Sequence, residues 1–372
     1  MERTVIVVGA GLSVPYGYPS GRSLVSLIIR RWKEDKLYEE EYRKLARDLE
    51  DTAAISIDRF LSEKKSHLNT GIAAIVKELV LAELNSIGHQ VEEDQDIIKT
   101  FLDEISPQHF PKVTFVSFNY DRHLEWRFFK RLKVLSPNES ETEAMEQLSK
   151  LNIIHIHGRL LPFCSSEASL LKYQPNQFIG YGEVPTSTND DAHNVTARNL
   201  AIEKFRTVYT NDEHPHPEAV LAIKNAKRVF FLGFGFDEKN MMKLGIGSGE
   251  VIYDWASKYV AGTCYRMPGI FKGRVESSFP FLKNRLYDLT DKKFFAEKFS
   301  LTDSKHDIER QKIQVRDCCT VSAIQERPKR PHDVTGYQAV VKCTDCRKDL
   351  RVYYSTEFES GRWEVRIDGK SE

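Results

Sequence analysis

The feature that most constrains the fold is the run Thr4–Val8, a β-branched apolar stretch without polar alternation. Such a run is typical of a strand buried on both faces of a parallel sheet. Gly9 and Gly11 follow at once, and a helical apolar pattern begins soon after Ser20. A strand, a glycine turn and a helix start let backbone N–H groups approach a phosphate in open α/β sheets. The stretch therefore predicts an α/β fold with a nucleotide site.

The glycine turn departs from the dinucleotide fingerprint of hydride-transferring Rossmann enzymes. The sixth position of that fingerprint is usually small, and here it is Val14. The acidic residue expected about 20 residues further on is missing, because Ile29–Glu34 continues a helical pattern. A plain dehydrogenase is therefore disfavoured. On this stretch alone, a turn shaped only for packing stays open as an alternative.

Length and composition narrow the class of protein. The 372 residues suffice for one large α/β domain and a smaller unit, at about 100–200 residues per domain. Lys plus Arg equals Asp plus Glu, 54 each, which argues against direct nucleic-acid binding through a global charge. No apolar run approaches the roughly 20 residues of a membrane span, and no export signal is visible. Six cysteines do not make a disulfide framework in a chain of this length, so we expect a cytoplasmic protein.

A long stretch over residues 22–106 shows helical apolar spacing in a charged background, most clearly at Ile72–Ala82. The block is longer than a simple crossover between two strands requires, so we expect an inserted helical layer beside the nucleotide cleft. Helical spacing returns at 196–208 and 217–226. Residues 173–194, rich in Gly, Pro, Asn and Ser, form a candidate lid or oligomer contact.

Further strands are expected at Val113–Phe118, Leu151–Ile156, Arg228–Leu232 and Tyr259–Tyr265, the last strand of the sheet. From about residue 304 the composition becomes charged and mixed, with a proline-rich hinge at Arg327–Pro331. Alternating apolar residues between Tyr337 and Ile367 predict a small β-unit. We therefore expect a large domain over residues 1–300 and an accessory domain over 301–372.

Polar or glycine-rich clusters follow several predicted strands, at the point where each strand ends. Besides the glycines after Val8, these clusters are Asn119–Asp121, His157–Gly158 and Gly233–Asp237. Ligands of open α/β sheets bind outside the carboxyl ends of the strands. The clusters are therefore expected to converge on one cleft.

Taken in this order, over roughly residues 1–290, the motifs resemble those of the sirtuin-like family of NAD-consuming enzymes. Gly9-Ala10-Gly11-Leu12-Ser13 looks like the family's Gly-Ala-Gly-x-Ser phosphate loop. Gly17-Tyr18-Pro19-Ser20 stands where the family has its Gly-Ile-Pro segment, over the nicotinamide end. Ser117-Phe118-Asn119-Tyr120-Asp121 resembles the Thr-x-Asn-x-Asp motif. The fold expected from the resemblance is a Rossmann-like parallel sheet.

The later motifs extend the resemblance. His157-Gly158 is similar to the His-Gly pair that carries the general base, and Gly233–Asp237 with Asn240 is similar to the glycine loop at the adenosine ribose. The Pro-Ser-Gly-Arg and Gly-Phe-Gly-Phe-Asp versions found here look most like the bacterial antiphage branch, whose members hydrolyse NAD. The resemblance implies NAD⁺ as substrate, with binding residues Gly9, Ala10, Gly11, Ser13, Pro19, Ser20, Asp121, Gly233, Phe234, Gly235, Asp237 and Asn240.

Asn119 and His157 are the candidate catalytic residues. An amide can hydrogen-bond the nicotinamide ribose and orient a water. An imidazole can take a proton from a ribose hydroxyl or water near neutral pH. Backbone N–H groups around Gly9–Ser13 are expected to hold the diphosphate.

Simpler interpretations stand beside these. His155 and His157 point to opposite faces if both lie on a strand, so His155 is expected to be a hydrogen-bonded core residue. Asn119 and Asp121, each taken alone, are also typical of side chains that cap the following helix. Asp121 is compatible with capping even where Asn119 is catalytic.

Two departures point away from protein deacylation. Deacylating sirtuins carry a zinc site of two Cys-x-x-Cys pairs, whereas Cys164 is the only cysteine between His157 and Gly233. Ser20-Gly21-Arg22 stands in place of the family's Asp-Phe-Arg. No catalytic metal is expected. Zinc held by the C-terminal thiols stays open beside ordinary reduced cysteines, the residues concerned being Cys318, Cys319, Cys343 and Cys346.

The expected activity is hydrolysis of NAD⁺ to nicotinamide and ADP-ribose, in an antiphage effector that depletes NAD⁺. The resemblance also implies a homo-oligomer, with a partner ATPase or a phage-derived trigger. A deacylase or ADP-ribosyltransferase is one alternative, and a non-catalytic sensor of NAD or ADP-ribose is another.

Overall fold

The computed structural model describes residues 1–34, 40–54, 56–92, 95–160, 214–247 and 253–297, and the backbone of 338–342, 349–354 and 363–366. The chain divides into two compact units, Met1–Thr302 and Asp303–Glu372. Each unit is described by itself below.

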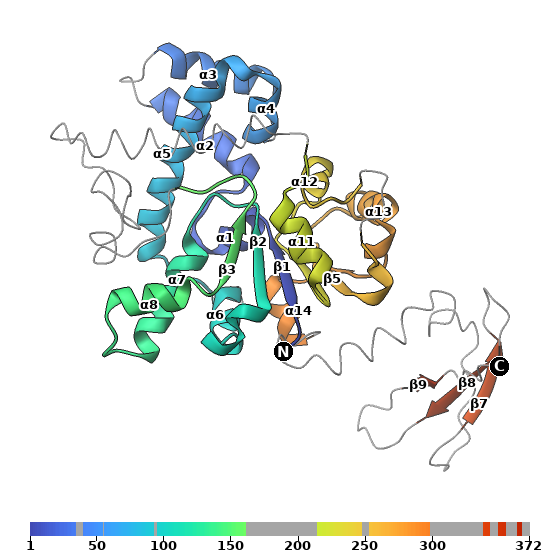
Figure 1. Ribbon diagram of the computed structural model, residues 1–372. Helices are drawn as coiled ribbons and strands as arrows, with labels where there is room; N and C mark the ends of the chain where they lie inside the picture. The colour runs from blue at the N-terminus through green and yellow to red at the C-terminus, as the bar shows by residue number, and fades with distance from the viewer. Residues whose placement is uncertain are drawn as a thin grey trace. The chain divides into compact units, whose positions relative to one another are not determined.

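The larger unit is built on a six-stranded sheet with the order β3-β2-β1-β4-β5-β6 (Figure 1). All its strand pairs are parallel. The strands are β1 (Thr4–Val8), β2 (Val113–Ser117), β3 (Asn152–His155), β4 (Arg228–Leu232), β5 (Tyr259–Thr263) and β6 (Leu286–Tyr287). This is the predicted α/β, Rossmann-like fold, and its strand order reverses direction between β1 and β4.

Helices cover both faces of the sheet because alternate residues of its strands enter two separate apolar cores. Ile6 and Val8 belong to the core under the N-terminal helices. Val5 and Val7 belong to the opposite core, which includes Ile223 and other residues of the later helices. Every position of β1 is buried. This burial on both faces explains why its sequence lacks polar alternation.

The predicted helical layer over 22–106 lies between β1 and β2. After the short α1 (Ala10–Ser13) and η1 (Val14–Tyr16) it contains α2 (Gly21–Glu34), α3 (Glu40–Asp51), α4 (Ile57–Glu63), η2 (Lys65–His67), α5 (Leu68–Ile87), α6 (Ile97–Glu104) and η3 (Pro107–Lys112). Helix α5 contains the predicted Ile72–Ala82 pattern and is buried along most of its length. An ion pair between Arg31 and Glu78 joins α2 to α5.

The later elements of the larger unit complete the two layers. They are α7 (His123–Leu135), α8 (Glu141–Leu148), α11 (Pro217–Asn225), α12 (Glu238–Lys243), η4 (Trp255–Ser257), α13 (Gly269–Ser278), η5 (Pro280–Leu282) and α14 (Asp291–Glu297). In Figure 1, α11, α12 and α13 lie on one side of the sheet, and α6, α7 and α8 on the other. Among the described residues, none of the helices combines the length and apolarity that crossing a membrane requires.

One strand expectation was wrong. β5 is not the last strand of the sheet, since the two-residue β6 pairs with it through Gly262 and Leu286. A strand of two residues has no period that a sequence pattern could display. The expected strands at Val113–Phe118 and Leu151–Ile156 are present but end one residue earlier, at Ser117 and His155.

The smaller unit contains the predicted β-structure between Tyr337 and Ile367. Its antiparallel sheet has the order β7-β8-β9, formed by β7 (Gln338–Lys342), β8 (Asp349–Tyr354) and β9 (Trp363–Arg366). Several other expectations fall outside the described residues: the loop at 173–194, the helical spacing at 196–208, the hinge at Arg327–Pro331, and the cysteines Cys164, Cys318, Cys319, Cys343 and Cys346.

Candidate active site at the carboxyl edge of the sheet

The two predicted glycine loops contact each other where β1 and β4 end. The N–H of Gly9 donates to the carbonyl of Leu232 at 3.1 Å, and the N–H of Gly11 donates to that of Gly233 at 3.0 Å. Gly233 has φ +54, and a Cβ there would lie 2.2 Å from the backbone nitrogen of Leu12. Only glycine fits this close approach, because any side chain would collide with backbone.

This contact changes the expected role of the first loop. The N–H groups of Gly9 and Gly11 already donate to β4-side carbonyls, and that of Leu12 donates to Gly9 at 3.0 Å. A diphosphate could use these three N–H groups fully only if the protein contacts gave way. The loop therefore packs the end of β1 against the end of β4. A diphosphate would need hydrogen-bond donors or cations from other residues as well.

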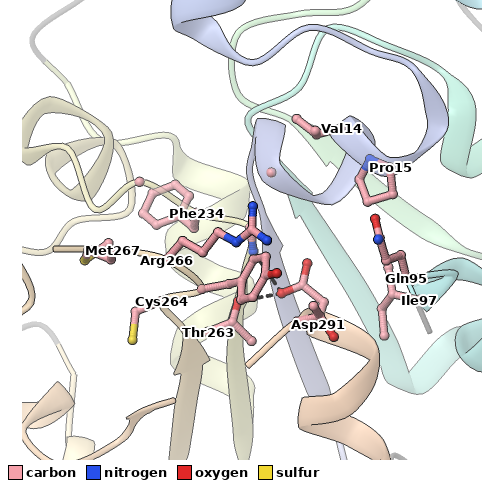
Figure 2. Close-up of a pocket in the computed structure, with 15 residues that line it drawn as sticks. Val14, Pro15, Gln95, Ile97, Phe234, Thr263, Cys264, Arg266, Met267 and Asp291 are labelled. Carbon is pink, nitrogen blue, oxygen red and sulfur yellow. Dashed lines mark hydrogen bonds between the residues drawn. The ribbon is translucent and has the colours of Figure 1, made fainter. Parts of the chain in front are cut away.

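A cavity of about 500 Å³ opens beside the loops (Figure 2). Four of the predicted binding residues line it: Gly11, Gly233, Phe234 and Gly235. Residues that were not foreseen complete the lining: Val14, Pro15, Gln95, Ile97, Thr263, Cys264, Tyr265, Arg266, Met267, Thr290 and Asp291. The walls thus carry a guanidinium and a carboxylate as well as apolar groups, which suits a ligand with both an anionic part and hydroxyls.

Asp291, at the start of α14, fixes the second glycine loop. Its Oδ1 accepts a hydrogen bond from Thr263 Oγ1 at 2.5 Å and one from the Gly233 N–H at 3.2 Å. Burial raises the pKa of Asp291 to about 6, although these two hydrogen bonds lower it. No motif precedes Asp291 in the sequence, and it reaches the site only because β6 and α14 pack beside β5. The one signal in the sequence was the position of Asp291 as a polar residue soon after a strand that follows β5.

Asn119 lies two residues after the end of β2, and its side chain bonds two residues of the first glycine loop region. Its Nδ2 donates to the Gly9 carbonyl and to Ser13 Oγ, each at 3.0 Å. The residue is 7% exposed, and its Oδ1 has no hydrogen-bond partner among the described residues. A buried acceptor without a donor costs about 1–3 kcal/mol. A hydroxyl or a water would satisfy it. The side chain bonds Gly9 and Ser13 and does not cap α7, and its catalytic role stays a prediction.

Asp121 is the side chain that binds the start of α7. Its Oδ1 accepts from the His123 N–H at 3.1 Å, and its carboxyl also bonds the side chain of Ser13. Burial raises the pKa of Asp121 to about 6, against the lowering effect of those two hydrogen bonds. Asp121 is therefore linked to Asn119 through Ser13, and it also fulfils the capping interpretation.

His157 lies in the turn after β3, packed against Phe118 and Tyr120. Its Nε2 is 3.1 Å from Oδ1 of Asn240, so the structure brings together two residues of the predicted set. A carbonyl oxygen only accepts, so Nε2 carries the proton and Nδ1 is the basic nitrogen of the neutral ring. Asn240 is held in turn by Asp237, whose side chain caps α12.

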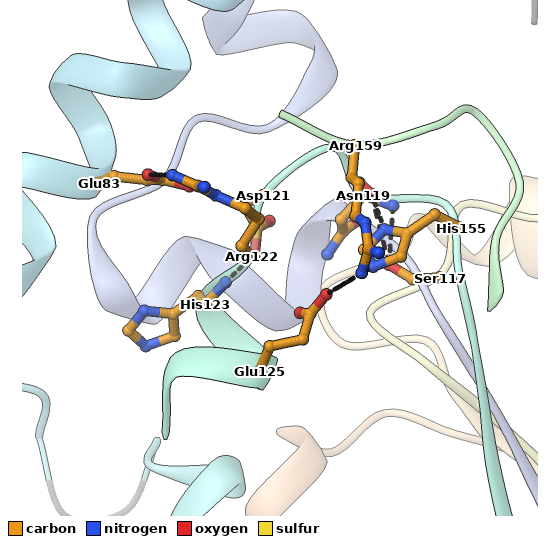
Figure 3. Close-up of polar contacts among 9 residues, drawn as sticks. All are labelled: Glu83, Ser117, Asn119, Asp121, Arg122, His123, Glu125, His155 and Arg159. Atoms are coloured by element: carbon orange, nitrogen blue, oxygen red, sulfur yellow. Dashed lines mark hydrogen bonds and ion pairs between the residues drawn. The ribbon is translucent and has the colours of Figure 1, made fainter. Parts of the chain in front are cut away.

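His155 is the buried, hydrogen-bonded histidine that the sequence predicts. Its side chain is 6% exposed. The ring contacts the Asn119 carbonyl through Nδ1 and Glu125 through Nε2 (Figure 3).

Ser20 Oγ accepts from the Ser23 N–H at 3.2 Å and so caps α2. Most of the predicted site residues are not among the residues that line the cavity, and both candidate catalytic residues are in this group: Gly9, Ala10, Ser13, Pro19, Ser20, Asn119, Asp121, His157, Asp237 and Asn240. Among the described residues no hydrogen bond joins Asn119 to His157, and no group of three or more His, Cys, Asp or Glu side chains could hold a metal ion.

Comparison with known proteins agrees with the sequence motifs over part of the chain. The family model described as the SIR2-like domain matches residues 113–245. This segment contains Asn119, Asp121, His157, Asn240 and the second glycine loop. A search of curated proteins found no match. The fold, the site and this family match together support a sirtuin-like domain with an activity related to NAD.

Proposed function

We propose that this protein is an NAD⁺ glycohydrolase that cleaves NAD⁺ to nicotinamide and ADP-ribose. The observation that carries the proposal is the unpartnered Oδ1 of Asn119, a buried acceptor on a side chain that bonds Gly9 and Ser13 of the first glycine loop. Such an acceptor can hold a ribose hydroxyl or the attacking water. His157, in the turn after β3, adds a base, which a pure binding site does not need.

The residues divide the reaction between them. The N-glycosidic bond breaks with its electron pair passing to the pyridine nitrogen, so nicotinamide leaves neutral and needs no strong general acid. Water attacks the anomeric carbon, and its proton passes to Nδ1 of His157, whose Nε2–H is held by Asn240. Asn119 orients the water or the ribose during attack.

The cavity accommodates the ADP part of the substrate. Arg266 supplies a cation for the diphosphate, which the engaged N–H groups of Gly9 and Gly11 do not. Asp291 supplies an acceptor for ribose hydroxyls at the same wall. These two residues extend the binding set inferred from the sequence.

The test is incubation of the purified chain with NAD⁺ alone, followed by chromatography for nicotinamide and ADP-ribose. Asn119→Ala and His157→Ala should each reduce release by at least about 100-fold, while the exposed Asn152→Ala leaves it unchanged. Unchanged turnover in both site variants contradicts the proposal. An inert wild-type chain that still binds ADP-ribose favours the sensor alternative, and release only with an acetylated peptide favours a deacylase.

We further propose, by the resemblance, that the chain is a cytoplasmic antiphage effector acting by NAD⁺ depletion. It would act as a homo-oligomer with a partner ATPase or a phage-derived trigger. Phage infection of cells that express the wild-type chain should lower cellular NAD⁺, and infection of cells expressing His157→Ala should not. Equal NAD⁺ in both cultures, with phage growth unaffected, contradicts this role.

A further inference from the structure

Glu125, in the first turn of α7, has a buried carboxylate that accepts hydrogen bonds from two side chains. Its Oε1 accepts from His155 Nε2 at 2.9 Å and from Arg159 Nη1 at 3.2 Å (Figure 3). The side chains of His155 and Glu125 are 6% and 5% exposed. Burial by itself would raise the pKa of Glu125, but the attraction and hydrogen bond of His155, together with Arg159, lower it to about 2.

The second ring nitrogen of His155 faces the main chain of Asn119. Nδ1 lies 3.1 Å from the Asn119 carbonyl oxygen. Both partners, a carbonyl and a carboxylate, are hydrogen-bond acceptors. Each ring nitrogen of His155 therefore faces a protein acceptor, and neither is left for another partner.

This contact matters because side chains hold both main-chain polar groups of Asn119. β2 ends at Ser117, and the Asn119 N–H donates to Ser117 Oγ at 3.1 Å. The Asn119 carbonyl accepts from His155. Ser117 Oγ also donates to this carbonyl, at the longer distance of 3.4 Å. The backbone at Asn119 directs its amide toward Gly9 and Ser13, so the position of that amide depends on His155 and Ser117.

Glu125 also fixes the turn that carries the other candidate catalytic residue. His155 precedes His157 by two residues and Arg159 follows it by two. Both flanking side chains bind the same oxygen of Glu125. One carboxylate is thereby connected to the Asn119 carbonyl through His155 and to both sides of the turn that carries His157.

We propose that His155 is a positioning residue which, anchored on Glu125, holds Asn119 and His157 in the relative placement that hydrolysis requires. The inference rests on the proposed NAD⁺ hydrolysis. His155 does not contact substrate in this account, since both its nitrogens are occupied by protein.

The test compares His155→Gln with a matched control. Gln carries both of its N–H donors on a single nitrogen, whereas His155 contacts Glu125 and Asn119 through two separate ring nitrogens. Gln therefore cannot reproduce both contacts in the geometry of the ring. Displacement of a catalytic group by about 1 Å costs up to about 100-fold in kcat, and we expect a loss of that order in His155→Gln. KM for NAD⁺ and the Kd for ADP-ribose should change less than about 3-fold, because the cavity residues are untouched.

His67→Gln is the control. Its ring is equally buried at 6% exposure and bonds Asp48 Oδ2 at 2.7 Å, within the helical layer. Loss of that bond should lower the thermal midpoint to a similar degree without lowering kcat. An unchanged kcat in His155→Gln overturns the proposal. A loss of kcat in both variants that is proportional to the fall in their thermal midpoints also overturns it.

A spectroscopic readout keeps this test separate from the proposed activity. ¹⁵N NMR of the wild-type histidines should show one ring with both nitrogens hydrogen-bonded to protein, and its signals should disappear in His155→Gln. A ring at that position with a nitrogen exposed to solvent overturns the proposal. If the wild-type chain releases no nicotinamide, the proposed function fails, and the ring spectrum still decides whether His155 makes both contacts.

Discussion

At the scale of single residues, the side chains of Asn119 and Asp121, which both follow β2, have different roles. Asn119 bonds Gly9 and Ser13 and keeps one buried acceptor unpartnered. Asp121, two residues later, bonds the start of α7. Both types of side chain are frequent at helix starts, so their sequence could not separate the two tasks. The separation comes from the direction in which each side chain leaves the turn.

Asp121→Asn should stabilise the protein increasingly as the pH rises. The pKa of Asp121 in the folded chain is about 6, above the roughly 3.9 of an unfolded chain. Between these two pKa values the folded state binds more protons than the unfolded state. Rising pH therefore lowers the free energy of unfolding. Asn keeps an acceptor for His123 and lacks the buried charge. Urea unfolding should show little difference near pH 4 and a gain of up to about 3 kcal/mol near pH 7.

The exposed Asp288→Asn is the control for that variant. Asp288 also accepts a backbone hydrogen bond, from Arg266 at 2.8 Å, but its carboxyl faces water. Its effect on the free energy of unfolding should not grow with pH. A pH-independent effect of Asp121→Asn would show that the carboxyl is not destabilised by burial.

At the scale of elements, the short helix α12 connects stability to the site. Asp237 caps α12 by accepting from the N–H groups of Lys239 and Asn240, at 3.0 and 3.4 Å. Asn240 then reaches back to His157. The motif in the sequence suggested that both polar residues face a ribose. In the structure one begins the helix and the other bonds the histidine.

Asp237→Ala should therefore cost about 1 kcal/mol of stability and also lower turnover, since it loosens the start of the helix that carries Asn240. Asp237→Asn keeps a capping oxygen and should restore both. Chemical unfolding and initial rates of nicotinamide release measure the two effects.

Ser140→Ala is the matched control, because Ser140 caps α8 through a capping box with Glu143. It should cost similar stability and leave turnover unchanged. A loss of turnover in Ser140→Ala equal to that in Asp237→Ala would mean that general stability, and not α12, governs the rate.

At the scale of the whole molecule, the larger unit contains its own complete sheet and two apolar cores. The fragment Met1–Thr302 should therefore unfold cooperatively, with a thermal midpoint within about 4 °C of the full chain. Calorimetry of the two forms measures this. A fragment that is insoluble, or that melts without a cooperative transition, would mean that residues after Thr302 are required for folding.

The sequence by itself determined the elements whose signals are local. The apolar run at Thr4–Val8 predicted a strand covered on both faces, and β1 is such a strand. The order of the motifs also placed Asn119, His157 and the second glycine loop at the carboxyl edge of one sheet. These features depend on residue type and spacing along the chain, which a sequence displays directly.

Only the tertiary structure decided which groups are free to bind and which are already engaged. It paired the Gly11 N–H with Gly233, brought Asp291 to the cavity from beyond a two-residue strand, and joined Glu125, His155 and the Asn119 carbonyl. Hydrogen bonds and burial of this kind arise between segments far apart in the chain. Their partners are set by the packing of the sheet and its helices, and no local pattern of residues records them.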